Sequence, residues 1–347
     1  MTNYNYNGMN AQDIANKIIK KEEAYENACY ELMPFEVKCQ YALELTPIIH
    51  PSVSPDRTRR QQLLTELRPE LLRRAEREDE YALYVLGSVG ADLSAPATDE
   101  ERRFLERSMN AGYGPAALAL LDRFYHGKKR SDPEAERILS WLAKRVGNDT
   151  PMLHRYQYYT LVGNKEKQEE LATELAVRGD YIATTRLANS LGEVLDFDSD
   201  KRVFWETVEF LVLEHFYNNG ATHLGDTLGM KLINERGCKR DTEKIKKIYV
   251  DLMFSYPYDR RQLLTIAGVP HNETGEDLFE AERICRLQIK DGRESNYWRL
   301  ILIALLSGDR EKVEAACDEA SKAHDGLLSV NISKAYHMLR HADRCER

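Results

Sequence analysis

The side chains best placed for metal binding lie close to the carboxyl end of the sequence. His337, His341 and Cys345 follow one another at intervals of four residues, a spacing that puts them on one face of a helix. Two imidazoles one turn apart can hold a zinc ion together. Cys345 stands a further turn away, which is a poor position for a third ligand to the same ion, and chain ends fray. We therefore expect no metal site, and no other pattern in the sequence points to a cofactor.

The thiols of the chain show no metal or redox pattern either. The six cysteines are Cys29, Cys39, Cys238, Cys285, Cys317 and Cys345, and no two form a C-x-x-C pair. Such scattered cysteines are typical of reduced thiols in a cytosol-like compartment, where each packs as a small apolar side chain. The first ten residues, MTNYNYNGMN, contain neither the basic nor the apolar stretch of a secretion signal. The sequence therefore predicts a cytoplasmic protein.

Known catalytic motifs do not occur in the sequence. It has no glycine-rich dinucleotide turn, no glycine-lysine phosphate loop, no H-E-x-x-H and no G-x-S-x-G. Catalytic residues can also converge from distant helices, so an enzyme with a dispersed site is an alternative of lower rank. We predict that the protein is not an enzyme.

A basic segment offers a site for anionic ligands. Residues Arg57 to Arg77 contain seven arginines and three glutamates in a pattern typical of one or two amphipathic helices. This surface could bind a nucleic acid, a phosphate-bearing ligand or an acidic protein, or it could be a solvated helix face with ion pairs between turns. The net charge of −8, from 49 basic and 57 acidic residues, disfavours a large nucleic-acid or anionic-membrane surface. Nucleic-acid or phosphate-ligand binding here is therefore our alternative function, not the preferred one.

Tyrosine and arginine side chains form the candidate binding surface that we prefer. Both types dominate binding hot spots, since each buries a large area and still presents a hydrogen-bonding end. Those on the first helices of successive helix pairs would line one concave surface, although core packing is the simpler role for an aromatic residue on such a helix. The candidates are Tyr84, Arg123, Tyr125, Tyr156, Tyr159 and Arg186.

The helix pairs that would carry these residues are clearest between residues 79 and 147. In the first pair, Ala82 is followed four residues later by Leu86-Gly87. Thr98 precedes Glu101 by three residues, which is the spacing of a capping box at the start of the second helix. Small residues let paired helices approach closely, and no pair can bury both of its faces alone, so successive pairs must stack.

A second pair repeats this plan. Ala116 precedes Leu120 by four residues, and Asp132-Pro133 supplies a cap and a first-turn proline for the second helix. Apolar residues between Ile138 and Val146 form the stripe that this helix is expected to bury.

Together these residues resemble the Sel-one-like subclass of tetratricopeptide repeats. The match rests on Ala82-x-x-x-Leu86-Gly87, Phe104-Leu-x-Arg-Ser-Met-x-x-Gly112, Ala116-x-x-x-Leu120, Phe124-x-x-Gly127, Asp132 and Trp141-Leu142. Leu121 departs from the pattern, since the family has glycine at this position. The resemblance implies stacked antiparallel helix pairs whose inner groove holds a peptide or a partner's helix without turnover.

Glycines mark the ends of further pairs. Gly112, Gly147, Gly179 and Gly220 are separated by 35, 32 and 41 residues, the spacing expected of helix-pair repeats. Another pair follows at Leu224-x-x-x-Leu228-Gly229, and helical patterns continue to the carboxyl end. These patterns predict an all-α fold, namely an α-α superhelix in which antiparallel helix pairs form a solenoid.

Three segments are expected along the chain. Residues 1–55 would form an N-terminal helical cap and a proline-containing linker, with the linker at residues 46–54. Residues 56–254 would hold the Sel-one-like helix pairs, and residues 255–347 would cap the solenoid with further helical pairs. The longest apolar run, Leu300 to Leu306, is too short to span a bilayer. We expect a soluble, non-catalytic adaptor for a protein or peptide partner, with its oligomeric state left open.

Overall fold

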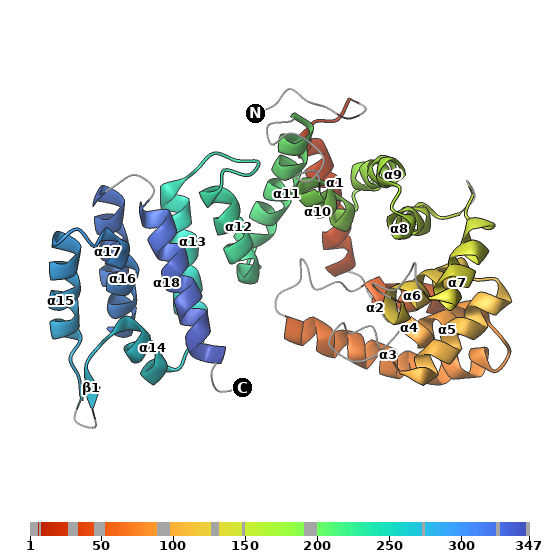
Figure 1. Cartoon of the computed structure of the whole chain (residues 1–347), viewed down its shortest axis with the longest axis horizontal. Coiled ribbons are helices and arrows are strands. Elements are labelled where there is room, and N and C mark those ends of the chain that lie inside the picture. Colours follow the sequence, from red (N-terminus) through yellow and green to blue (C-terminus); the bar gives the residue numbers. More distant parts are fainter. Residues whose placement is uncertain are drawn as a thin grey trace. The chain divides into compact units, whose positions relative to one another are not determined.

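The computed structural model of the protein describes residues 6, 8–26, 34–44, 53–88, 98–125, 132–147, 150–190, 200–272, 275–323 and 327–344. Nearly all of them lie in helices, which confirms the expected all-α class (Figure 1). Within these ranges the only sheet is a pair of two-residue strands, β1 (His271–Asn272) and β2 (Gly275–Glu276). In the same ranges, none of the helices combines enough length and hydrophobicity to cross a lipid bilayer.

The chain packs as two compact units, and the division between them falls within one long helix. Unit 1 comprises residues Met1–Val212 and unit 2 comprises Leu213–Arg347. The dividing helix is α11 (Asp200–Asn218). The segment boundaries at residues 55 and 254 that the sequence indicates stay predictions.

Unit 1 consists of helices that pack largely in sequence order. They are α1 (Ala11–Glu26), α2 (Phe35–Glu44), α3 (Val53–Ala75), α4 (Glu80–Ser88), α5 (Asp99–Ala111), α6 (Gly114–Phe124), α7 (Pro133–Ala143), α8 (Met152–Val162), α9 (Lys165–Val177), α10 (Tyr181–Ser190) and the first part of α11. Each helix from α2 to α6 packs on the helix that follows it. Helix α9 packs on both α8 and α10. The first helices of successive pairs also touch, since α6 contacts both α4 and α8. Consecutive helix pairs therefore lie against one another in this unit.

Two helices of unit 1 begin at the caps that the sequence indicates. The side-chain oxygen of Thr98 accepts a hydrogen bond from the backbone N–H of Glu101 at 3.2 Å, and the Glu101 carboxylate accepts one from the N–H of Thr98 at 2.8 Å. This is the expected capping box at the start of α5. Asp132 caps α7 in the expected way, with Pro133 as the first residue of the helix.

Removing the cap of α7 should lower the stability of unit 1. Asp132 Oδ1 accepts a hydrogen bond from the backbone N–H of Glu134 at 2.9 Å, and Asp132→Ala leaves that donor without its partner. We expect the free energy of unfolding to fall by about 1 kcal/mol. Asp132→Asn keeps a side-chain acceptor and should lose much less. Urea denaturation followed by circular dichroism measures both, and equal losses would contradict the capping role.

The glycine of the Leu-Gly signature lies where two helices of a pair meet. A Cβ atom added to Gly87 in α4 would lie 2.5 Å from Cγ of Leu105 in α5. In unit 2, a Cβ on Gly229 would lie 2.7 Å from the ring of Tyr249. The second copy has Leu121 at this position, where its side chain is fully buried. At Gly87 and Gly229 the small residue is thus a packing requirement.

Two expectations for helix ends in unit 1 are wrong. Gly112 follows α5 in the left-handed conformation, with φ of 114°, but Gly147 does not close its pair in this way because α7 already ends at Ala143. Val53 and Ser54, which the sequence places in the linker, belong to α3, and residues 46–52 of the expected linker lie outside the described residues. Pro55 does not prevent this start, because a proline in a first helical turn lacks only an N–H that has no partner there.

Unit 2 departs from a simple succession of pairs. Its elements are the last part of α11, a 3₁₀ turn η3 (Thr222–Leu224), α12 (Gly225–Ile233), α13 (Thr242–Ser255), α14 (Arg260–Ala267), α15 (Leu278–Lys290), a 3₁₀ turn η4 (Glu294–Asn296), α16 (Tyr297–Leu306), α17 (Arg310–Ala323) and α18 (Leu327–Arg344). The last helix, α18, packs against α13, α14, α16 and α17 (Figure 1). It therefore completes the middle of the unit and does not extend its end.

Candidate binding site

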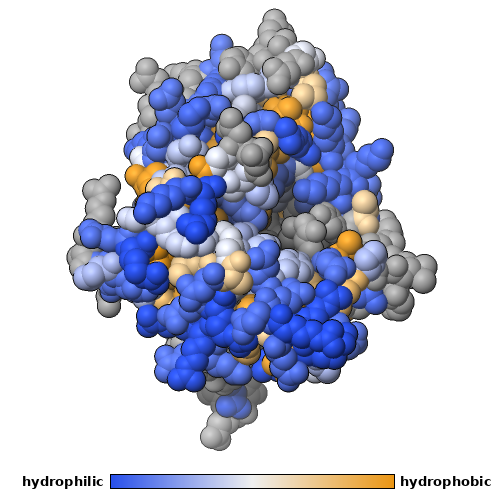
Figure 2. All heavy atoms as spheres, turned by 90° about the vertical axis from the view of Figure 1, so that its right-hand side faces the viewer, coloured by the Kyte–Doolittle hydropathy of each residue, from blue (hydrophilic) through white to orange (hydrophobic). Residues whose placement is uncertain are grey.

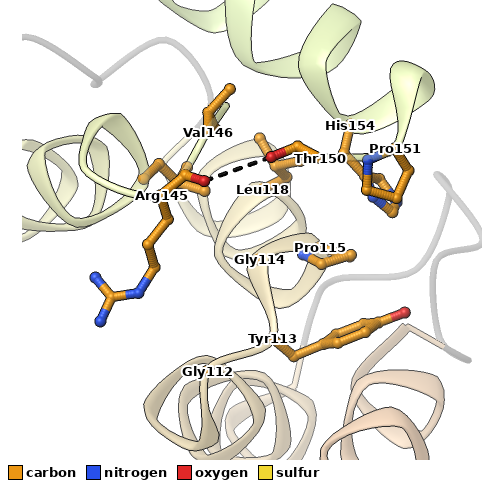
Figure 3. Close-up of a pocket in the computed structure, with 11 residues that line it drawn as sticks. Gly112, Tyr113, Gly114, Pro115, Leu118, Arg145, Val146, Thr150, Pro151 and His154 are labelled. Carbon is orange, nitrogen blue, oxygen red and sulfur yellow. Dashed lines mark hydrogen bonds between the residues drawn. The ribbon is translucent and has the colours of Figure 1, made fainter. Parts of the chain in front are cut away.

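A pocket of about 350 Å³ opens in unit 1 where two helix pairs meet (Figure 3). Three chain segments surround it: the turn between α5 and α6, the end of α7 and the residues that follow it, and the start of α8. The residues lining it are Gly112, Tyr113, Gly114, Pro115, Leu118, Leu142, Arg145, Val146, Thr150, Pro151 and His154. Its volume is at the lower end of the range for ligand pockets in proteins.

Local backbone features shape this pocket. Gly112 adopts the left-handed conformation that turns the chain from α5 into α6, and Pro115 lies in the first turn of α6. On the opposite side, the hydroxyl of Thr150 accepts a hydrogen bond from the N–H of Gly147 at 3.0 Å. The same hydroxyl donates to the carbonyl oxygen of Arg145 at 3.4 Å, as Figure 3 shows. These contacts fix the connection between α7 and α8.

The pocket combines apolar walls with a few polar groups. Leu118 and Leu142 form buried parts of its lining. Burial and the neighbouring Tyr84 and Glu80 raise the pKa of Tyr113 to about 12, so its phenol is neutral and can donate a hydrogen bond. The guanidinium of Arg145 lies 4.0 Å from the ring of Trp141 and points away from Pro151 and His154 in Figure 3. The arrangement suits an uncharged ligand group better than an anion.

His154 contributes a neutral imidazole to the pocket wall. Its Nδ1 atom is buried and has no hydrogen-bond partner among the described residues. Burial lowers the pKa of His154 below its ordinary value of 6.5, because the charged imidazolium would lose its hydration. The side chain is thus uncharged at neutral pH.

Acid should destabilise unit 1 through this histidine. The unfolded chain binds a proton at His154 with the ordinary pKa of 6.5, whereas the folded chain resists it. The contribution of His154 to the free energy of unfolding is therefore complete above pH 6.5. It is lost as the pH drops from 6.5 through the lowered pKa of the folded chain. Thermal melts between about pH 8 and pH 5 should show a smaller acid-induced loss for His154→Asn than for the parent. His337→Asn, which changes an exposed histidine, is the control and should behave like the parent.

On the face of the molecule drawn in Figure 2, hydrophilic residues predominate. Hydrophobic residues appear there as small separate areas. Among the described residues visible on that face, no broad apolar surface stands out as a binding site. Enclosed space between elements is therefore a stronger indication of a site than the open surface.

The structure places three of the predicted site residues in contacts around α5. Arg123 donates from Nη1 to the carbonyl oxygen of Gly87 at 2.6 Å and from Nη2 to the Glu101 carboxylate at 3.1 Å. Tyr125 is buried, and its hydroxyl accepts from Nη2 of Arg102 at 2.7 Å. The ring centre of Tyr84 lies 5.2 Å from that of Tyr113, so Tyr84 does not line the pocket but packs on a residue that does.

The other three predicted residues lie on α8 and α10. The hydroxyl of Tyr156 accepts a hydrogen bond from Nη1 of Arg186 at 3.0 Å, and the guanidinium carbon lies 5.3 Å from the centre of the same ring. Tyr159 is half-buried, with its ring 5.3 Å from that of Tyr158. Tyr156 and Arg186 thus form a direct pair, whereas the other four have their described partners outside the predicted set.

The pocket residues differ from the predicted ones because they come mainly from turns. Reasoning from helix faces selects residues on first helices and passes over Tyr113, Val146 and His154. A signal was present, since glycines and prolines cluster at the joints of this region, at residues 112–115 and 147–151. Both joints contribute residues to the lining of the pocket. Small and turn-forming residues there leave space that larger side chains would fill.

Two of the arginines in the basic segment, Arg73 and Arg74, form ion pairs with nearby glutamates. The Glu70 carboxylate accepts hydrogen bonds from Arg73 at 2.7 and 2.8 Å and from Arg74 at 2.9 Å. Arg74 also donates to Glu36 of α2 at 2.8 Å and lies over the ring of Phe35. Arg74 thus links α2 to α3, and the pairing of both arginines leaves less positive charge for an anionic ligand.

Neither the histidines nor the cysteines form a site among the described residues. No group of three His, Cys, Asp or Glu side chains there could hold a metal ion, and Cys345 lies outside the described ranges. Cys39, Cys285 and Cys317 are buried free thiols. Burial raises the pKa of Cys39 and of Cys317 to about 12, so neither is a ready nucleophile.

No protein-family model and no curated protein matches the sequence. The functional argument therefore rests on the residues and contacts described above.

Proposed function

We propose that the protein is a non-catalytic scaffold that binds a peptide or a helix of a partner protein. The observation that carries this proposal is the pocket of about 350 Å³ at the junction of two helix pairs, with apolar walls and hydrogen-bonding groups. In a binding protein, such a pocket holds the side chain that anchors the partner.

The arrangement of unit 1 supports this role. The first helices α4, α6 and α8 contact one another in sequence, which supports a continuous strip of their outer sides next to the pocket. We propose that unit 1 is a solenoid of Sel-one-like pairs and that the partner lies along this strip. Tyr159 and Arg186 would then contact the partner, while Arg123 and Tyr125 would hold the helices in place. The free thiols fit a cytoplasmic location.

The pocket also indicates the chemistry of the anchoring side chain. Its volume suits one large side chain, and Leu118, Leu142 and Val146 favour an apolar one. The neutral phenol of Tyr113 and the neutral imidazole of His154 can each hydrogen-bond to a polar tip. A tyrosine or tryptophan of the partner meets both requirements.

A capture experiment with a filled pocket tests the proposal. Val146→Trp puts a large side chain into the pocket, whereas Leu153→Trp adds the same side chain to α8 at an exposed position that does not line it. Tagged parent, Val146→Trp and Leu153→Trp proteins are used to capture partners from native lysate, which are identified by mass spectrometry. Circular dichroism establishes that all three are folded.

We expect a protein partner that the parent and Leu153→Trp capture and Val146→Trp does not. A partner retained equally by all three would remove the pocket from the interface. Turnover of a captured small molecule would contradict a non-catalytic scaffold.

The alternative function is binding of a nucleic acid or a phosphate-bearing ligand through Arg57 to Arg77. It has less support, because Arg73 and Arg74 already pair with Glu70, and Arg74 also pairs with Glu36. Its test is binding of labelled single-stranded RNA at low salt followed by a salt titration. Affinity that falls steeply with salt would favour it, because each neutralised phosphate releases a counterion.

A further inference from the structure

Beside the pocket of unit 1, just after the end of α7, an arginine is held flat against a tryptophan ring. The guanidinium carbon of Arg145 lies 4.0 Å from the centre of the Trp141 ring. Its Nη1 atom donates a hydrogen bond to the carbonyl oxygen of Trp141 at 3.4 Å. These two contacts restrict a long side chain before any ligand binds, so less conformational entropy is lost on binding.

The outer edge of this guanidinium is open to a ligand. Arg145 is exposed, and no carboxylate among the described residues pairs with it, whereas Arg137 on the same helix pairs with Glu134. Lys144, next to Arg145 in the chain, is also exposed and has no ion pair within the described part of the chain. A stacked guanidinium uses its face for the ring and keeps N–H groups at its edge. A carboxylate matches that edge, because it accepts two parallel hydrogen bonds.

The position of this guanidinium separates the anion from the group that fills the pocket. Arg145 belongs to the pocket wall, yet its side chain leads away from Pro151 and His154 (Figure 3). The pocket itself suits an uncharged group, so a carboxylate bound to Arg145 lies outside it. In an extended peptide, side chains two positions apart lie on the same side with about 7 Å between them. One peptide can therefore fill the pocket and reach Arg145 at once.

We propose that the partner segment carries an aspartate or glutamate within four residues of its aromatic anchor, and that this carboxylate binds the free edge of Arg145. The inference rests on the proposed function, because it requires a peptide in the pocket. It narrows the partner to a segment in which an aromatic and an acidic side chain are close neighbours. A charged anchor, such as a phosphorylated tyrosine, does not fit this arrangement, since the guanidinium points away from the pocket interior.

Selection from a phage library of random linear peptides tests this proposal. The full-length parent, Arg145→Gln and Arg137→Gln serve as baits. Arg137→Gln is the matched control, because it removes the same charge from an exposed position on α7 that does not line the pocket. Circular dichroism and thermal melting establish the fold of each bait. A selected peptide is then synthesised with its acidic residue and with the corresponding amide in its place, and fluorescence anisotropy measures both affinities.

We expect the parent and Arg137→Gln to select peptides that have a tyrosine or tryptophan and an acidic residue within four positions of it. Arg145→Gln should keep the aromatic preference and lose the acidic one. The amide peptide should bind the parent about fivefold more weakly than the acidic peptide. It should bind Arg145→Gln as well as the acidic peptide does, because both changes remove the same ion pair.

Two results would overturn this inference and leave the scaffold function in place. One is a set of aromatic peptides without an acidic preference, and the other is an acidic preference that Arg145→Gln retains. A parent that selects no peptide at all would instead contradict the proposed function, and this inference with it.

Discussion

Replacing Gly87 by valine is expected to lower the free energy of unfolding of unit 1 by about 3 kcal/mol. A Cβ atom at this position would lie 2.5 Å from Cγ of Leu105 and 3.0 Å from the carbonyl oxygen of Glu101, well inside van der Waals contact. Leu105 is fully buried and cannot move away without displacing the core around it. The branched side chain forces α4 and α5 apart, and the hydrogen bond from Arg123 to the carbonyl of Gly87 is strained with them.

A second glycine provides the control. A Cβ atom added to Gly114, at the start of α6, would have no heavy atom within 4 Å, and this residue does not need a left-handed backbone. Gly114→Ala should therefore change stability by no more than about 0.5 kcal/mol. Urea denaturation monitored by circular dichroism compares the two variants with the parent. Similar midpoints for Gly87→Val and the parent would mean that the two helices are farther apart than described.

Arg123→Met should lower the free energy of unfolding by about 2 kcal/mol. The guanidinium joins the Glu101 carboxylate to the carbonyl oxygen of Gly87, and the side chains of Arg123 and Glu101 are only 12% and 15% exposed. Methionine keeps the apolar stem but leaves a mostly buried carboxylate and a carbonyl without this donor. The loss is measured by urea denaturation.

The control for this prediction is an ion pair on the solvent-exposed surface of the protein. Arg137 pairs with Glu134 at positions that are 52% and 36% exposed, and Arg137→Met should cost no more than about 0.5 kcal/mol. The double variant Arg123→Met, Glu101→Gln should recover part of the loss, because the orphaned charge is removed. If Arg123→Met were as mild as Arg137→Met yet abolished partner capture, Arg123 would be a binding residue after all.

Local patterns in the sequence predict particular helix starts of this fold. Thr98 and Asp132 cap the helices that the sequence assigns to them. In unit 2, the side chain of Asp241 caps α13 by accepting a hydrogen bond from the N–H of Lys244. Capping needs only residues two or three positions apart, so one sequence contains all the information. The sequence misplaces the end of α7 because Gly147 has the residue type of a closing glycine without its conformation.

Long-range packing and the site could be predicted only in part. Nothing in the sequence of α18 specifies that it packs on α13, since many amphipathic helices could serve there. The tyrosines and arginines are recognisable as residues with contacts to make, yet Arg123 and Tyr125 make theirs within unit 1. The pocket depends on how three chain segments approach each other, and turn geometry is a property of the folded chain.

The position of α18 sets an order of events during synthesis. Helix pairs of unit 1 can pack on the preceding pair as soon as each leaves the ribosome, because their contacts are local in sequence. Helix α13 can pack on α12 in the same way, but its buried Tyr249 also packs against Tyr336 of α18, with ring centres 5.6 Å apart. The parts of α13 and α16 that α18 covers therefore stay open in the nascent chain until residues 327–344 emerge. Through this interval chaperones and proteases can reach the apolar surface of α13 and α16 that α18 later buries.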